Sequence, residues 1–317
     1  MDELDVRILR ELTQANSVVP ARAGLRTSYR TVAHALAVSP GTVRNRINRM
    51  YAGGVLTGTS VYANPNLLGL AAGAYAVEVA TLGRKQEVVN LLRDLEGVFF
   101  IQNFRGSLLG IAFVYPDSQT PEETLAAILR ITGATGGVFT RVIYPPCQVS
   151  LSRTEWKLVS RLIRGGFSTY AAMSREVGVS VRTIKRTVSK LVRTRAIFSV
   201  PTMDYRALTG CVPADLIVAF TSPATRPEAE REILKLVGDR MIFAGVWADF
   251  AMYSLILPKV STLAQLAEEV PHIPGVRMAR VEIVEEHIDR VQALQSYVDR
   301  QWAPVSAGRP SLAPAPP

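Results

Sequence analysis

The sequence repeats itself once along its length. When it is shifted by 141 residues, positions 27–69 align with positions 168–210 without a gap. The identical pairs include Tyr29 with Tyr170 and Gly69 with Gly210, and apolar residues keep the same spacing through the whole window. Chance identity could approach this level, but the matched periodicity favours duplication. Because 317 residues are also too many for one ordinary domain, we predict a tandem of two similar halves.

The first helix predicted in each half has an apolar face with helical spacing. This face consists of Leu4, Ile8 and Leu12 in the first copy, and of Trp156, Val159 and Ile163 in the second. These helices align only if the first copy contains nine extra residues, which we place around positions 16–26.

Serine and threonine residues mark where the next two helices begin. Thr27 or Ser28 can cap the second helix of the first copy, and Ser168 can cap its counterpart, which ends before Gly178. Ser39 and Ser180 cap the third helices, whose core positions are Val43, Ile47 and Met50, and Ile184, Val188 and Leu191. Two helices, a tight turn and a further helix are the spacing of a helix-turn-helix. Positions 55–62 and 196–203 then predict a small hairpin or wing in each copy.

The remainder of each half alternates strands with two helices. Strands are predicted at 75–80, 98–104, 108–115 and 138–144, with helices at 86–95 and 121–130. In the second half the strands are predicted at 216–221, 241–246, 251–257 and 276–284, with helices at 228–237 and 262–269. A βαββαβ order favours an antiparallel, ferredoxin-like sheet with both helices on one face. Residues 285–302 predict one more helix, and the Pro/Ala/Ser-rich residues 303–317 predict a disordered tail.

The predicted fold class is therefore α+β, with two winged helix-turn-helix domains alternating with two ferredoxin-like βαββαβ domains. The predicted boundaries are 1–62 and 149–204 for the helix-turn-helix domains, and 63–148 and 205–302 for the βαββαβ domains. We expect the apolar sheet faces to pack on each other within the chain. An apolar stripe predicts that the last helix docks on its own chain or a neighbour: Ile288, Val291, Leu294 and Val298. The expected assembly is a pseudo-dimeric monomer or a homodimer.

Positive charge is concentrated in two of the four predicted domains. Residues 1–50 carry 8 Lys+Arg and 4 Asp+Glu, and residues 151–200 carry 11 and 2, whereas the intervening and following segments are mildly acidic. A solvated charged surface is one explanation of the net charge of +9. Alternation at the scale of domains instead favours two modules that bind a polyanion.

The third helix of each copy presents residues suited to a DNA major groove on the face opposite its core stripe. Arg and Lys pair with guanine edges or phosphates, and Asn pairs with adenine. No acidic residue occurs between Val38 and Gly73, or between Glu176 and Asp204. The predicted DNA-contacting residues are Ser39, Thr42, Arg44, Asn45, Asn48 and Arg49, and Ser180, Arg182, Thr183, Lys185, Arg186 and Lys190.

The same residues resemble a known family. The runs Val38–Ile47, Gly54–Leu56 and Asn64–Gly69 are similar to the DNA-binding domain of the leucine-responsive/AsnC (Lrp/AsnC) regulators, and the βαββαβ units resemble their RAM-like ligand and assembly domain. The resemblance implies a sequence-specific regulator of transcription that binds double-stranded DNA, often with an amino acid as effector. The family's turn with an acid before the third strand is approximated by Gly245–Asp249 in the second half, whereas Phe104–Ser107 in the first half lacks the acid. Asp249 is therefore the predicted effector-binding residue, with a solvated turn residue as the alternative.

An enzyme is the main rival, because sirohaem decarboxylases resemble the same regulators in fold. The three histidines, His34, His272 and His287, are far from one another and from the cysteines in sequence, and each is expected at the surface. Cys147 and Cys211 match no metal or redox spacing and are expected in the core. We therefore expect no enzyme activity, no cofactor and no metal site.

The cell compartment is predicted from what the sequence lacks. The longest charge-free apolar stretch near the first predicted strand, Leu67–Val77, is well short of the roughly 20 residues that span a membrane. The chain opens on acidic residues instead of a basic region followed by an apolar run. A cytoplasmic protein without membrane contact is expected.

Overall fold

The computed structural model describes residues 1–14, 28–247 and 250–302. The predicted insert around 16–26 and the predicted tail 303–317 lie outside the described residues. The first half contains the helices α1 (Glu3–Gln14), α2 (Tyr29–Leu36) and α3 (Pro40–Ala52), the strand β1 (Leu56–Ala63), the 3-10 helix η1 (Pro65–Leu68), and then β2 (Leu70–Glu78), α4 (Lys85–Asp94), β3 (Val98–Phe104), β4 (Leu108–Pro116), α5 (Glu122–Thr132) and β5 (Gly137–Val142).

The second half follows the same order. It contains α6 (Arg153–Gly165), α7 (Tyr170–Val177), α8 (Val181–Arg193), β6 (Ile197–Met203), β7 (Val212–Phe220), α9 (Arg226–Val237), β8 (Met241–Val246), β9 (Phe250–Leu257), α10 (Val260–Glu269) and β10 (Val276–Asp289). A 3-10 turn, η6 (Val291–Leu294), and a short helix, α11 (Gln295–Trp302), complete the described chain. We call α1–α3 and α6–α8 the first and second helical units, and β2–β5 and β7–β10 with their helices the first and second sheet modules.

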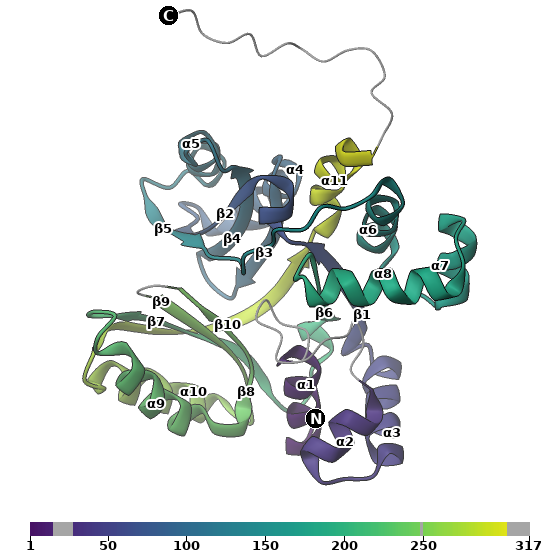
Figure 1. Ribbon diagram of the computed structural model, residues 1–317. Helices are drawn as coiled ribbons and strands as arrows, with labels where there is room; N and C mark the ends of the chain where they lie inside the picture. The colour runs from purple at the N-terminus through teal and green to yellow at the C-terminus, as the bar shows by residue number, and fades with distance from the viewer. Residues whose placement is uncertain (15–27, 248–249, 303–317) are drawn as a thin grey trace, which may run out of the picture.

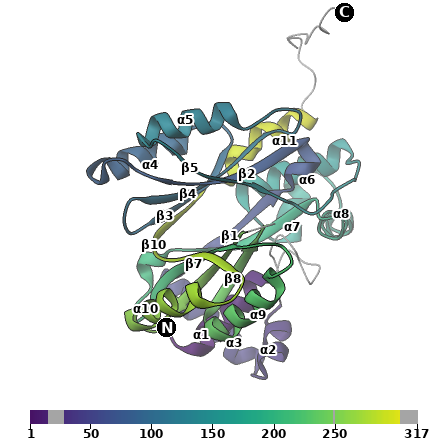
Figure 2. The ribbon, with the colours of Figure 1, turned by 90° about the vertical axis from the view of Figure 1, so that its left-hand side faces the viewer.

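The two sheet modules join into one eight-stranded antiparallel sheet. Its strand order is β5-β2-β4-β3-β10-β7-β9-β8, so each module has the predicted ferredoxin-like order and β10 bridges them. The first part of β10 pairs with β7 and the last part, from Val284 to Asp289, pairs with β3. Figures 1 and 2 show α4 and α5 on the outer side of one module, and α9 and α10 on the outer side of the other.

The prediction of a helix over 285–302 is wrong for its first third. β10 continues to Asp289, and the helix begins only at Gln295. Strand pairing with β3 explains the difference, because the backbone of 284–289 satisfies its hydrogen bonds on the free edge of the first module. His287 therefore lies in a strand between the modules, which contradicts the predicted surface position.

The predicted hairpin wings are also wrong. Each helical unit is followed by a single strand, and β1 and β6 pair with each other in an antiparallel ribbon that joins the two halves. Tyr62 of β1 lies opposite Phe198 of β6. A lone strand leaves one set of backbone groups unpaired, and the duplicate strand supplies the partner. The ribbon β1–β6 thus connects both helical units to both sheet modules.

Each helical unit packs against a different support. α1 lies against β8, where the Thr13 hydroxyl donates to the Ile242 carbonyl and Arg10 forms a 2.6 Å ion pair with Asp239. α6 instead lies against α11, where the Ser160 hydroxyl donates a 2.7 Å hydrogen bond to Asp299. Docking of the C-terminal segment on its own chain is confirmed, since the predicted stripe is buried: Ile288, Val291, Leu294 and Val298.

The apolar faces of the two sheets were predicted to pack on each other. They do face each other, with all four module helices on the outside (Figure 2). Close packing is not observed, however, because a cavity of about 1670 Å³ lies between them. Both end strands, β5 and β8, line this cavity, and among the described residues they are not paired with each other.

Candidate nucleic-acid interface

The predicted helix-turn-helix caps are present in the first helical unit and at the third helix of the second. Ser28 caps α2, and Ser39 caps α3 by accepting a 3.0 Å hydrogen bond from the Thr42 amide. Ser180 caps α8 in the same way, at 3.1 Å from the Thr183 amide. For α7 the cap is Thr169 in place of the predicted Ser168, whose hydroxyl accepts from Arg161. Such caps stabilise a helix by about 0.5–2 kcal/mol each and fix where it starts.

The core stripes of α3 and α8 are buried as predicted, so their opposite faces are turned outward. In α3 the exposed residues are Arg44, Asn45, Asn48 and Arg49. In α8 they are Arg182, Lys185, Arg186 and Ser189, with Lys190 half-buried. The cap residues Ser39 and Ser180 are exposed and Thr42 and Thr183 are half-exposed, at the start of each outward face.

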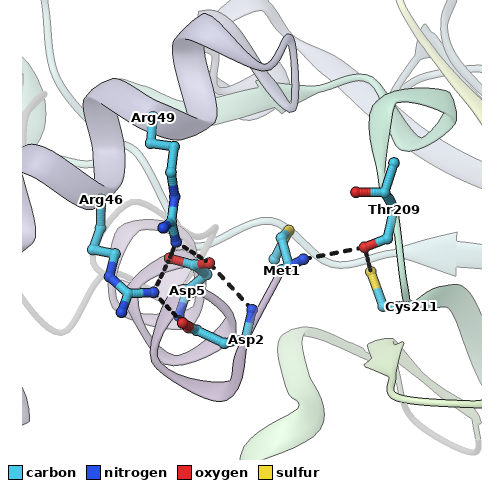
Figure 3. A network of polar contacts seen from close by, with 7 residues as sticks. All are labelled: Met1, Asp2, Asp5, Arg46, Arg49, Thr209 and Cys211. Atoms are coloured by element: carbon cyan, nitrogen blue, oxygen red, sulfur yellow. Dashed lines mark hydrogen bonds and ion pairs between the residues drawn. The ribbon is translucent and has the colours of Figure 1, made fainter.

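Two of the predicted DNA-contacting cations already have partners inside the protein. Arg49 donates to both oxygens of Asp5 at 2.9 and 3.2 Å, and Arg46 donates to Asp5 and Asp2 (Figure 3). Asp5 is only 1% exposed, so these guanidinium groups neutralise a buried carboxylate. In α8, Lys190 lies 2.8 Å from Glu155 of α6.

The two ion pairs occupy equivalent positions in the repeat. Arg49 and Lys190 are 141 residues apart, as in the ungapped alignment, whereas Asp5 and Glu155 are 150 apart. The difference of nine equals the predicted insert. In both copies a cation of the third helix thus holds the first helix, so contact with DNA by Arg49 or Lys190 would compete with a structural role.

The unpaired charge is unequal between the two helical units. The outward face of α8 carries three exposed cations for which no ion pair is found among the described residues: Arg182, Lys185 and Arg186. Lys185 also lies over the ring of Tyr170, 5.6 Å from its centroid. The outward face of α3 has Arg44 alone in this state, beside Asn45 and Asn48.

A basic hollow beside α8 was missed by the sequence analysis. It has a volume of about 410 Å³ and is lined by Glu155, Arg186, Thr187, Ser189, Lys190 and Arg193. Arg193 is exposed and follows Arg186 and Ser189 at helical spacing, so extending the predicted face by one turn would have found it.

A model of the AsnC-type helix-turn-helix domain matches residues 1–51. Residues 1–51 are an AsnC-type helix-turn-helix domain. The AsnC-type domain comprises α1–α3, with Ser39 and the exposed face of α3 in the position of a recognition helix. A helix-turn-helix of this type implies DNA binding.

One relative matches about half of the chain. The HTH-type transcriptional regulator Ptr1 of Methanocaldococcus jannaschii is 26% identical over 166 residues, which are 52% of this chain and 96% of that regulator. The likeness therefore extends beyond the AsnC-type domain to a length equal to one half of the tandem.

Solved structures match both halves together. The crystal structure of the siroheme decarboxylase NirDL covers 94% of this chain and 98% of its own, with a TM-score of 0.55 and 13% identity. The same enzyme in co-complex with an iron-uroporphyrin III analogue gives a TM-score of 0.53 at 14% identity. At this identity the likeness shows a shared fold for the whole chain.

The predicted effector residue, Asp249, lies outside the described residues. The hairpin turns at this position of each module are held by a cation of the chain itself. Lys85 donates to the carbonyls of Phe104 and Gly106, and Arg226 donates to the carbonyl of Trp247. Lys85 and Arg226 are equivalent in the repeat, as are Gly106 and Trp247. These carbonyls are thus already bound by internal cations, where an amino-acid ammonium group would otherwise be expected.

A polar cluster lies at the junction of the two modules and lines the cavity in part. The Gln102 amide nitrogen of β3 donates to Asp215 of β7 and lies 3.0 Å from His287 Nε2 of β10. Burial raises the pKa of Asp215 to about 7 and lowers the pKa of His287 to about 3. Sequence patterns could not have located this cluster, because its members come from three strands of both halves.

The two other histidines, His34 and His272, are exposed as predicted. Cys147 is buried and Cys211 is half-buried. Among the described residues, no group of three or more His, Cys, Asp or Glu side chains is placed to hold a metal ion. In the same part of the chain, no helix has the length and apolar character needed to cross a membrane.

Proposed function

We propose that this protein is a sequence-specific regulator of transcription of the Lrp/AsnC type, with two DNA-reading heads in one chain. The AsnC-type domain is the first head. The second helical unit is the second head, since it repeats the helix order, the Ser180–Thr183 cap and the exposed basic face. The observation that carries the proposal is the cluster of unpaired cations on the outward face of α8, in the position that a recognition helix occupies in the AsnC-type domain.

The two heads are proposed to act together on one DNA duplex in the cytoplasm. The ribbon β1–β6 links them in a single chain, which gives the second head a high effective concentration once the first has bound. The arrangement supports a pseudo-dimeric monomer or a homodimer that needs no partner chain to bring two heads together.

Selection of binding sequences from random duplex DNA tests the proposal. We expect enrichment of a bipartite site, bound by the full chain with a strong dependence on salt. The matched control is a chain with Arg182, Lys185 and Arg186 replaced by Ala, which should lose most of the affinity. Failure of the unmodified chain to enrich any sequence would contradict the proposal.

A tetrapyrrole-modifying enzyme is the second candidate, favoured by His287 at the cavity between the modules. Against it, no cation lining the cavity lies near His287 in sequence or strand register to hold carboxylate groups. Adding iron uroporphyrin III to the protein distinguishes the candidates. A new Soret band that is lost in His287→Phe would favour the enzyme, and an unchanged spectrum would favour the regulator.

A further inference from the structure

We propose that the cavity between the sheet modules binds a neutral, largely apolar molecule with a hydroxyl or carbonyl group, and that the ribbon β1–β6 senses it. Its regulatory part rests on the proposed function, whereas the binding part does not.

The walls of the cavity are apolar and incompletely covered. At about 1670 Å³ the cavity exceeds the roughly 300–1,000 Å³ of most small-molecule sites. Large apolar side chains that line it remain half-exposed although they lie between two sheets: Phe100, Phe243, Phe250 and Met252. Covering them would release water from apolar surface at roughly 25 cal/mol per Å². The walls therefore favour a large apolar body.

The polar end of the cavity offers one acceptor and one donor. The two hydrogens of the Gln102 amide point to Asp215 and to His287 Nε2, which leaves its carbonyl oxygen as an acceptor. His287 is neutral because burial lowers its pKa, and with Nε2 accepting, the proton is assigned to Nδ1. The rings of Phe100 and Tyr205 flank this imidazole at 5.1 and 4.5 Å. A hydroxyl or carbonyl group matches such a pair.

A charged ligand is disfavoured at this end. The nearest formal charge belongs to the Asp215 carboxylate behind Gln102, which would repel an anion. The guanidinium groups among the described lining residues are those of Arg277 and Arg280. Arg280 is already paired with Glu78 at 3.1 Å and lies seven residues from His287 along β10, about 23 Å of extended strand. A carboxylate near His287 would therefore be buried without a partner, at a cost of several kcal/mol.

The cavity also touches the element that connects the two heads. Several residues of β6 line it, among them Phe198, Val200 and Met203. Tyr62 of β1 lines it too, and its hydroxyl donates a 2.5 Å hydrogen bond to Asp289 at the end of β10. Because β1 and β6 lead directly from α3 and α8, a ligand that moves the ribbon changes how the two recognition helices are placed.

The open edge between β5 and β8 provides access. These end strands both line the cavity and are not paired with each other in the described part of the chain. Entry there requires no strand to separate from another.

Binding is tested with N-phenyl-1-naphthylamine, a neutral fluorophore with an N–H group. We expect saturable fluorescence enhancement that is weakened at least about tenfold by Ala74→Trp, which fills the cavity from β2. Ala74→Phe is a milder second variant if the first unfolds. The matched control, Leu91→Trp, adds the same ring to an exposed position on α4 outside the cavity and should bind normally. Equal binding by all variants would overturn the proposed site.

Competition identifies the ligand class. 1-Naphthol should displace the fluorophore better than naphthalene, and Gln102→Met should abolish that difference. Preferential displacement by leucine or by iron uroporphyrin III would overturn the assignment of a neutral ligand.

The sensing step is tested separately with the selected DNA. The fluorophore should change DNA affinity at least about threefold in the unmodified chain, and not in Ala74→Trp. Binding without any change in DNA affinity would overturn sensing by the ribbon. Fluorophore binding by a chain that binds no DNA would instead overturn the proposed function and leave the cavity site standing.

Discussion

Arg49 of the third helix lies 2.9 Å from Asp5 of the first, and their ion pair fastens the recognition helix to a carboxylate that is almost fully buried. Replacing Arg49 by Ala leaves Asp5 with Arg46 alone. We expect this to lower the free energy of unfolding by about 1–3 kcal/mol, measured by urea denaturation. Arg44→Ala, on the same helix without such a partner, is the control and should change it little. A loss that is equal in the two variants would contradict the structural role of Arg49.

The unequal charge of the two heads predicts unequal contributions to the salt dependence of DNA binding. Replacing Arg182, Lys185 and Arg186 by Ala removes three unpaired cations, so the log–log salt slope should fall by about 2.7. Replacing Arg44, Asn45 and Asn48 removes one cation and should lower the slope by about 0.9. Fluorescence anisotropy over a salt series measures both. Lys190 and Arg49 are left intact because their ion pairs hold the fold. Equal slopes would refute the ranking of the heads.

The two recognition helices should read different half-sites. Asn45 and Asn48 favour contacts with adenine, whereas Arg182 and Arg186 favour guanine. The selected operator is therefore expected to be asymmetric, and Arg186→Ala should relax the sequence preference in one half-site only. Recovery of a perfect palindrome would argue against this assignment, unless two chains pair like with like.

Asp215 and His287 predict opposite effects of pH on stability. The pKa of Asp215 is raised from 3.8 to about 7 in the folded state, so its contribution is present below pH 3.8 and is lost as the pH rises to 7. The pKa of His287 is lowered from 6.5 to about 3, so its contribution is present above pH 6.5 and is lost as the pH falls to 3. Between pH 4 and 6.5 the two effects oppose each other.

Single replacements should expose each effect in urea denaturation over this pH range. Asp215→Asn leaves the His287 effect, so stability should rise with pH by about 1 kcal/mol per unit. His287→Phe leaves the Asp215 effect, and stability should fall with pH by a similar amount. If either variant showed the opposite slope, the charge states assigned to the polar cluster would be wrong.

The C-terminal segment should stabilise the second helical unit without being needed for association. A chain ending at Arg290 loses three buried apolar side chains: Val291, Leu294 and Val298. We expect it to be less stable by at least about 4 kcal/mol, with the same mass by light scattering, because α11 docks on its own chain. Unchanged stability would remove α11 from the support of α6, and an octamer of the full chain would contradict a pseudo-dimeric monomer or homodimer.

Local patterns in the sequence predicted most of the elements. Helix caps, apolar stripes and strand alternation located α3, α8, β3 and β8 to within a residue or two. These signals succeed because a cap or a buried stripe is decided by neighbours within one or two turns. The DNA-contacting face was derived in the same way and stays a prediction.

Features that depend on contacts between the halves could not be predicted. The wing sequences do not show that β1 chooses β6 as its partner, and residues 285–289 do not show that an unpaired strand edge waits 180 residues earlier. The ion pairs of Arg49 and Lys190 were missed because their partners lie on other helices. The cluster of Gln102, Asp215 and His287 was missed for the same reason.

The pairing of β3 with β10, against the open edges of β5 and β8, has a consequence for what a duplicated chain can become. Two identical subunits related by a twofold axis must treat corresponding edges alike, so both would close or both would stay open. Here the two halves differ in sequence, and only the second has a strand of 14 residues where the first has one of 6. Fusion thus released the pair from symmetry: one edge could seal the two halves together while its counterpart remained free to admit a ligand.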